Sequence, residues 1–119
     1  MKILHFSDAQ LKEIDEDTAL HASQRIVLNN TSRDHLFTLR VLELAKGGST
    51  PWYYYEWEHE IFIHSGNGEI LYKDKWIPVT EGYFIYVGKN EDHQIRNRGD
   101  EPLLIVSRIP VGDENGSQY

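Results

Sequence analysis

Two stretches of the sequence decide the fold: residues 47–66, which read GGSTPWYYYEWEHEIFIHSG, and residues 82–97, which read GYFIYVGKNEDHQIRN. Both contain a short run, His59–Ser65 and Tyr83–Val87, in which aliphatic residues alternate with aromatic or polar ones. A glycine follows each run. Alternation with a period of two is typical of a strand that has one buried face. The two stretches therefore predict short β-strands separated by turns.

The same pattern continues in both directions along the chain. Between the strands lie turn-forming groups such as Lys46-Gly47-Gly48 and Ser65-Gly66-Asn67-Gly68. After residue 20 no stretch keeps a 3.6-residue apolar period long enough for a helix. Close, even spacing of short strands predicts an all-β, antiparallel sandwich or barrel. The expected strands are Gln24–Asn29, Leu36–Leu44, Trp52–Tyr55, His59–Ser65, Glu69–Tyr72, Trp76–Val79, Tyr83–Val87, His93–Asn97 and Leu103–Ile109.

The length of 119 residues suits one domain, since a second would be too small to bury a core of its own. We expect an N-terminal segment over residues 1–22, with one or two helical turns at Asp8–Ile14. A barrel over residues 23–111 and a flexible tail over residues 112–119 complete the predicted organisation.

Charge and composition exclude several classes of function. Twelve Lys and Arg against nineteen Asp and Glu give a net charge of −7, which argues against nucleic acid or an anionic membrane as partner. The absence of cysteine excludes disulfides, thiolate metal sites and cysteine nucleophiles. No apolar run approaches the ~20 residues of a spanning helix, so a cytoplasmic location is expected.

Strand alternation places polar side chains among aliphatic ones. His59 shares a face with Ile61 and Ile63, and Tyr53 and Tyr55 point the same way as each other. Because buried polar residues are uncommon, they are the informative exceptions on a face that otherwise reads as interior. This face is the predicted location of a functional pocket.

The spacing within residues 47–66 resembles the first motif of the cupin superfamily, G-x5-H-x-H-x3-E-x6-G. Gly47 begins the motif and Gly66 closes it. Tyr53 and Tyr55 stand at the two His positions, and His59 stands at the Glu position.

Residues 82–97 fit the second cupin motif, G-x5-P-x-G-x2-H-x3-N, in the same register. It begins at Gly82 and ends on His93 and Asn97, with Gly88 and Asn90 at the Pro and inner Gly positions. The match extends over roughly residues 25–110. The resemblance implies an antiparallel jelly-roll-type cupin β-barrel with a short irregular or helical N-terminal segment.

The string around His59 is similar to a subgroup of small cupins in which four histidines hold manganese or a similar ion. The resemblance implies one metal ion held at Tyr53, Tyr55, His59 and His93, two of which are tyrosine here. Deprotonating two tyrosines at pH 7 costs about 8 kcal/mol, a cost that a hard ferric ion offsets better than Mn(II), Ni(II) or Zn(II). Iron is therefore the favoured metal if the tyrosines ligate. The alternative is a metal-free pocket in which the tyrosines are walls.

Other residues are candidates for the same pocket. Arg40 lies within a predicted strand, where it either holds a carboxylate or oxyanion or forms a salt bridge at a sheet edge. Ser107 and Ile105 share one face of the last strand, and Ile61 lies two residues after His59 on the face of His59. These three residues are therefore expected to line the substrate pocket. His64 points away from His59 and is expected to pack or to contact a partner.

Two classes of function agree with this pocket, both with a small organic molecule as ligand. One is an enzyme: an iron-dependent oxygenase at the Tyr and His positions, or a metal-free isomerase or lyase in which His59 or His93 moves a proton. The other is a non-catalytic binding domain. Outward-facing bulk at Tyr54, Phe62, Phe84 and Tyr86 further predicts a homodimer.

Overall fold

The computed structural model of the chain describes residues 1–32, 35–52 and 58–110. In these ranges one short 3₁₀ helix is followed by strands alone, which confirms the all-β prediction. The elements are η1 (Phe6–Asp8), β1 (Leu11–Glu13), β2 (Leu20–Ser32), β3 (His35–Ser49), β4 (His59–Ser65), β5 (Asn67–Tyr72), β6 (Lys75–Thr80), β7 (Phe84–Val87), β8 (Ile95–Asn97) and β9 (Leu103–Pro110). No helix among them is long and apolar enough to cross a membrane.

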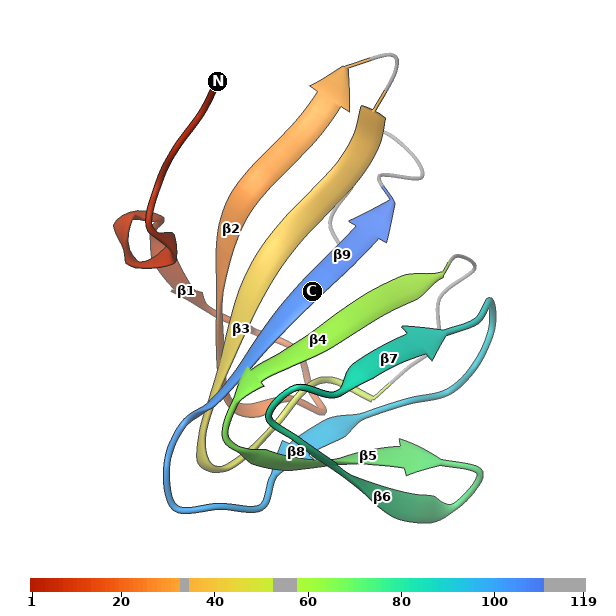
Figure 1. Cartoon of the computed structure of the whole chain (residues 1–119). Helices are drawn as coiled ribbons and strands as arrows, with labels where there is room; N and C mark the ends of the chain where they lie inside the picture. The colour runs from red at the N-terminus through yellow and green to blue at the C-terminus, as the bar shows by residue number, and fades with distance from the viewer. Residues whose placement is uncertain (33–34, 53–57, 111–119) are drawn as a thin grey trace.

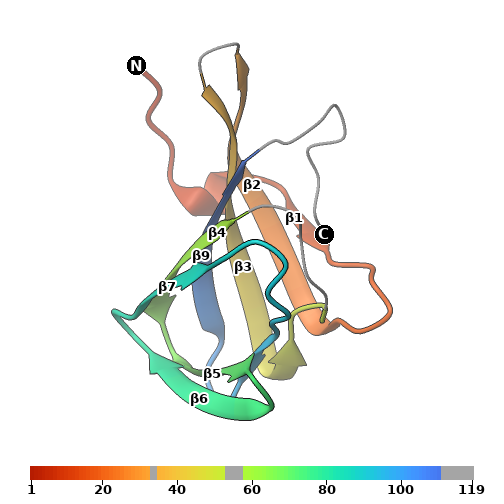
Figure 2. The same ribbon diagram turned by 90° about the vertical axis from the view of Figure 1, so that its right-hand side faces the viewer.

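The strands form one antiparallel sheet that curls on itself (Figure 1, Figure 2). Their order is β6-β5-β8-β3-β9-β4-β7, and β2 with β1 extends the sheet beside β3. Strand β3 pairs with β2 and β9 along most of its length, and Ser49 at its end pairs with Arg96 of β8. A single strand therefore runs through both walls of the half-barrel.

The expected turn at Lys46-Gly47-Gly48 is wrong, because β3 continues through it to Ser49. Gly47 has φ +78°, and the register against β2 shifts between Ala22↔Leu44 and Leu20↔Ser49. A Cβ on Gly48 would lie 2.7 Å from the carbonyl oxygen of His21. The glycines here bend the strand sharply and allow close backbone contact, so they do not end it.

The helical turn expected at Asp8–Ile14 is also misplaced. The turn that exists is η1, while β1 pairs with the outer edge of β2 in the register Leu11↔Arg25. The Arg25 side chain donates to the carbonyl oxygens of Ser7 and Ala9, which holds this segment against β2. Pairing with an open strand edge satisfies backbone groups that a single helical turn would leave exposed.

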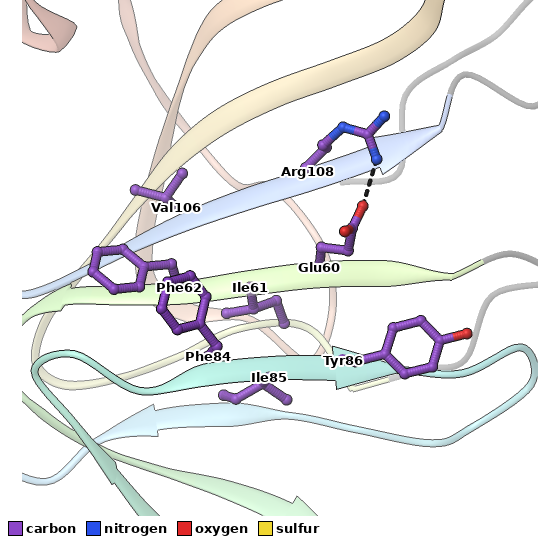
Figure 3. A pocket seen from close by; sticks show the side chains of 8 residues that line it. All are labelled: Glu60, Ile61, Phe62, Phe84, Ile85, Tyr86, Val106 and Arg108. Carbon is purple, nitrogen blue, oxygen red and sulfur yellow. Dashed lines mark hydrogen bonds and ion pairs between the residues drawn. The ribbon is translucent and has the colours of Figure 1, made fainter.

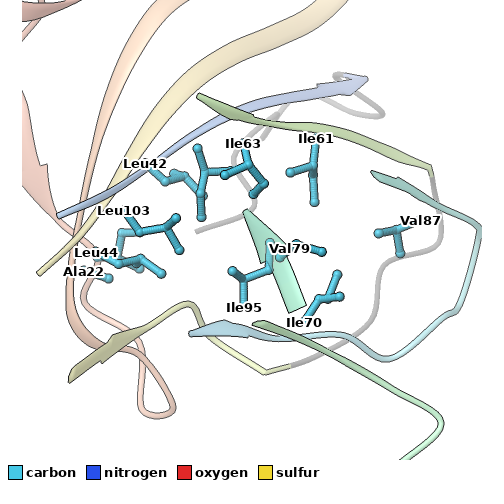
Figure 4. Close-up of a cluster of buried hydrophobic side chains, with 12 residues drawn as sticks. Ala22, Leu42, Leu44, Ile61, Ile63, Ile70, Val79, Val87, Ile95 and Leu103 are labelled. Carbon is cyan, nitrogen blue, oxygen red and sulfur yellow. The ribbon is translucent and has the colours of Figure 1, made fainter. Parts of the chain in front are cut away.

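The core fills the concave side of the curled sheet (Figure 4). Half of its members are alternate residues of β3, β4 and β9. The others come from β2, the segment before it, and β5 to β8. The members are Ile14, Ala22, Leu42, Leu44, Ile61, Ile63, Ile70, Val79, Val87, Ile95, Leu103 and Ile105. Complete burial of one such aliphatic side chain contributes about 1.5–3 kcal/mol.

Asn97, the last residue of the second motif, holds the loop before β9. Its Nδ2 donates to the carbonyl oxygens of Leu44 at 3.0 Å and Glu101 at 2.8 Å, and its Oδ1 accepts from the Gly99 amide at 2.8 Å. The side chain is buried, so these bonds replace water and join β3 to the turn that leads into β9.

Candidate active site

Strand pairing aligns one row of side chains across the inner face. Arg40 of β3 pairs with Ser107 of β9, Ser107 pairs with Ile61 of β4, and Ile61 pairs with Ile85 of β7. Directly opposed residues in a sheet point to the same side. His59 lies two residues before Ile61 on the same face of β4, so the inner face carries three polar groups beside the aliphatic core.

Arg40 is 2% exposed and lies in the interior of the sheet. Its Nη2 donates to Ser107 Oγ at 3.2 Å and its Nη1 donates to Gln24 Oε1 at 3.5 Å. Because β3 has β2 on one side and β9 on the other, the edge-strand setting considered for Arg40 is wrong. The guanidinium instead brings a positive charge into the barrel.

His59 and His93 contact each other edge to face. Their ring centroids are 5.2 Å apart with an interplanar angle of 79°. His59 comes from β4 and is 0% exposed, and His93 comes from the segment between β7 and β8 and is also buried. The His93 Nδ1 lies 3.2 Å from the carbonyl oxygen of Glu91, a contact that orients its ring.

Burial keeps both imidazoles neutral at pH 7. It lowers the pKa of His59 to about 3, with smaller contributions in the same direction from His93 and from the positive charge of Arg40. Burial also lowers the pKa of His93, opposed in part by the Glu91 backbone contact and the charges of Glu91 and Asp92. A neutral imidazole can accept a proton or bind a metal ion.

A cavity of about 230 Å³ lies between β5, β6 and β7, and His93 is one of its walls. The other inward-facing walls include Ile70, Val79, Ile85 and Val87. The alternation in Tyr83–Val87 places Ile85 and Val87 on one face, so the sequence could have predicted these two walls of the cavity. That β5 and β6 face them follows only from the three-dimensional fold.

The structure brings together part of the predicted site. His59, His93, Arg40 and Ser107 are all buried on the inner side of the barrel. Ile61 and Ile105 belong to the hydrophobic core cluster, and their contact with a substrate stays a prediction. Tyr53 and Tyr55 lie outside the described residues, so their part in the site stays a prediction as well.

Two of the four predicted metal-ligand positions, His59 and His93, lie among the described residues. His59 and His93 are neutral, adjacent imidazoles, which suits them to one ion. In the part of the chain that the structure describes, no group of three or more His, Cys, Asp or Glu is placed to hold a metal. A complete ligand set therefore depends on positions 53 and 55.

The curled antiparallel sheet is the architecture of a cupin domain. The chain belongs to the Cupin_2 family of cupin domains, which it matches over residues 40–108. It is similar to L-ectoine synthase of Shouchella clausii, with 29% identity over 117 residues that make up 96% of this chain and 85% of the relative.

Solved structures agree with this assignment. The polyketide cyclase RemF of Streptomyces resistomycificus superposes with a TM-score of 0.83 at 25% identity, over 92% of this chain and 79% of RemF. A protein described as a predicted oxalate decarboxylase from Thermotoga maritima superposes with a TM-score of 0.81 at 20% identity, over 92% of this chain and 98% of that one. The second likeness concerns the fold alone.

Proposed function

We propose that this cupin is an enzyme that acts on a small organic molecule inside its barrel by moving a proton, as an isomerase or lyase does. The observation that carries the proposal is the pair of buried, neutral imidazoles in edge contact, of which His93 is a wall of the 230 Å³ cavity. A neutral imidazole beside a mostly apolar cavity is suited to general base catalysis.

The contact with Glu91 assigns the roles of the two His93 nitrogens. A proton on Nδ1 donates to the Glu91 carbonyl oxygen 3.2 Å away, which leaves Nε2 with its lone pair. In the proposed step a substrate C–H bond breaks, its electrons stay on the substrate as an oxyanion, and Nε2 holds the proton. The proton then returns to another substrate atom in an isomerase, or to a leaving group in a lyase.

His59 and Arg40 support this step from the same interior. His59 lies in edge contact with the His93 ring. The charge of Arg40 opposes protonation of His59, so the proton stays on His93 and is available for return. The same charge stabilises negative charge on a bound substrate.

The likeness to enzymes favours catalysis over simple binding. Two of the relatives, with 29% and 25% identity, are named for a reaction, a synthase and a cyclase. Because one fold hosts many functions, these names support an enzyme acting on a small molecule and leave the substrate open.

Solvent exchange tests the proposal without knowledge of the natural substrate. The protein is incubated in D₂O with L-ectoine and with small carbonyl compounds such as dihydroxyacetone and oxaloacetate, and deuterium incorporation is followed by NMR. We expect exchange above the buffer rate, lost in His93→Gln and kept in His64→Gln, whose exposed side chain lies on the outer face of β4. Wild-type protein that binds such compounds without exchange would support the non-catalytic binding domain.

A metal-dependent cupin is the second candidate, favoured by the neutrality of both histidines. His59 and His93 would supply nitrogen ligands and Tyr53 and Tyr55 phenolate ligands. A bound ferric ion would supply Lewis-acid and redox chemistry, including the oxygenase activity expected from the sequence.

Colour distinguishes the two candidates. If the tyrosines ligate, ferric-loaded protein absorbs visible light by phenolate-to-iron charge transfer, and Tyr53→Phe with Tyr55→Phe removes the absorption and most of the iron. If they are pocket walls, this double variant binds iron as weakly as wild type. In that case Tyr53→His with Tyr55→His raises Zn(II) affinity, because imidazole avoids the ~8 kcal/mol needed to deprotonate two phenols.

A further inference from the structure

Two carboxylates line the 230 Å³ cavity in the segment that leads into His93. Among the walls that the structure describes, Glu91 and Asp92 are the only residues charged at pH 7, since no Lys or Arg lines the cavity and His93 is neutral. In the described part of the chain neither carboxylate has an ion-pair partner. The cavity therefore presents negative charge beside a ring that can accept a proton.

The backbone fixes the Glu91 carboxylate in place. The Gly88 amide donates to Glu91 Oε1 at 2.6 Å, and a Cβ on Gly88 would lie 2.8 Å from the same oxygen. A carboxylate has about four acceptor sites, so one bond to Gly88 leaves room for a donor on a ligand. Because the side chain is already held, it loses little conformational entropy when a ligand binds.

Strand β7 contributes a ring to the mouth of this cavity. Phe84 and Tyr86 point away from Ile85, an inner wall, so their rings belong to the outer face of the sheet (Figure 3). Tyr83 lies two residues before Ile85 and therefore on its side of the chain. It lines the cavity and is 51% exposed, so it stands at the opening.

Strand β5 ends in a second ring at the same opening. Tyr72 lines the cavity and is 42% exposed. The ammonium of Lys73 lies 5.2 Å from the centroid of the Tyr72 ring, so this ring accepts a cation over its face. Aromatic faces and carboxylates both attract a positively charged nitrogen, and the mouth of the cavity combines the two.

We propose that the substrate of this cavity carries a cationic nitrogen, such as an ammonium group, which binds Glu91 and Asp92 while the reacting carbon lies at His93. The inference rests on the proposed function, because it names the substrate class of the same cavity. Charge balance supports it. An oxyanion formed beside two carboxylates would be repelled by them, and a positive group on the substrate offsets that repulsion.

Three probes of one shape and different charge test the inference: butylammonium, 1-butanol and butyrate. Each is titrated into the full chain and followed by saturation-transfer difference NMR. Wild type is expected to bind butylammonium about fivefold more tightly than 1-butanol, and butyrate more weakly than either. Equal affinity for the three probes would overturn the inference.

A double variant shows whether the two carboxylates cause the preference. Glu91→Gln with Asp92→Asn should bind butylammonium no more tightly than 1-butanol, because the charge is lost while an amide oxygen remains to accept from Gly88. Glu81→Gln with Glu101→Gln is the matched control: both side chains are exposed and outside the cavity, and the net charge changes equally. Near-ultraviolet circular dichroism checks the fold of both. A folded Glu91 and Asp92 variant that keeps the wild-type preference would overturn the inference.

Deuterium exchange separates this inference from the proposed function. Aminoacetone and hydroxyacetone, which differ in an ammonium against a hydroxyl group, are each incubated with the protein in D₂O. We expect a larger increase over the buffer rate with aminoacetone. Equal increases for both compounds would support the proposed function and overturn this inference. Preferred binding of butylammonium without exchange of either compound would support a cationic ligand and contradict the proposed catalysis.

Discussion

At the scale of single residues, the burial of His59 makes stability depend on pH. The pKa of His59 is about 3 in the fold, against the ordinary value of 6.5 that applies in the unfolded chain. Between these values the unfolded chain binds a proton at His59 that the native chain does not, so the free energy of unfolding falls as pH falls from 6.5 towards 3. The loss from this residue between pH 7 and pH 5 is about 2 kcal/mol.

Urea unfolding at the two pH values measures this effect. In His59→Gln the decrease between pH 7 and pH 5 should be smaller than in wild type by that amount. His64→Gln, on the exposed face of the same strand, should keep the wild-type decrease. Equal decreases in wild type and His59→Gln would show that His59 titrates normally in the fold.

Arg40 should control the protonation of its neighbour. Its charge lowers the pKa of His59, so Arg40→Gln is expected to raise that pKa. Ser107→Ala removes a hydrogen-bond partner of Arg40 and keeps the charge, so it is the matched control. Titration of the His59 ring protons by NMR gives the answer, and an unchanged pKa in Arg40→Gln would mean that the charge of Arg40 does not contribute to it.

At the scale of elements, two glycines separate backbone strain from steric clash. Gly66 and Gly82 have φ of +104° and +93°, and a Cβ would lie 2.9 Å from the Pro102 carbonyl oxygen at Gly66 but meets nothing within 4 Å at Gly82. Gly82→Ala should therefore cost about 1–2 kcal/mol, and Gly66→Ala should cost more because backbone must move. Thermal or urea unfolding of the two variants checks this order; a Gly66→Ala variant as stable as Gly82→Ala contradicts it.

The strands were predictable where the cause is local. Alternation around His59 and Ser107 placed both side chains on the inner face, and the glycine frames around His59 and His93 indicated the fold. The course of β3 through Gly47 was not predictable, because turns and bulges favour the same residue types. They differ in whether β3 stays paired with β2 after Gly47, which depends on the three-dimensional fold. The cavity walls on β5 and β6 depend likewise on contacts between distant strands.

At the scale of the whole molecule, the sheet should exchange its amide hydrogens unevenly. β3 pairs with β2, β8 and β9, while β7 ends the strand order and pairs with β4. Mass-spectrometric hydrogen exchange should find residues 38–44 among the slowest and residues 84–87 faster. Equal protection of the two segments would contradict this order.

The position of β3 also governs the order of events during synthesis. Residues 37–44 find their partners in residues 103–110, and strands β4 to β8 are made between the two. Until β9 leaves the ribosome, the edge of β3 that pairs with it has unsatisfied backbone groups, so the nascent chain can form the β2–β3 hairpin early but cannot close its core. Contacts this distant in sequence slow folding, and a chain interrupted before residue 103 would expose a strand ready to pair with another chain. The wall that carries Arg40 is therefore begun well before the strand that completes it is made.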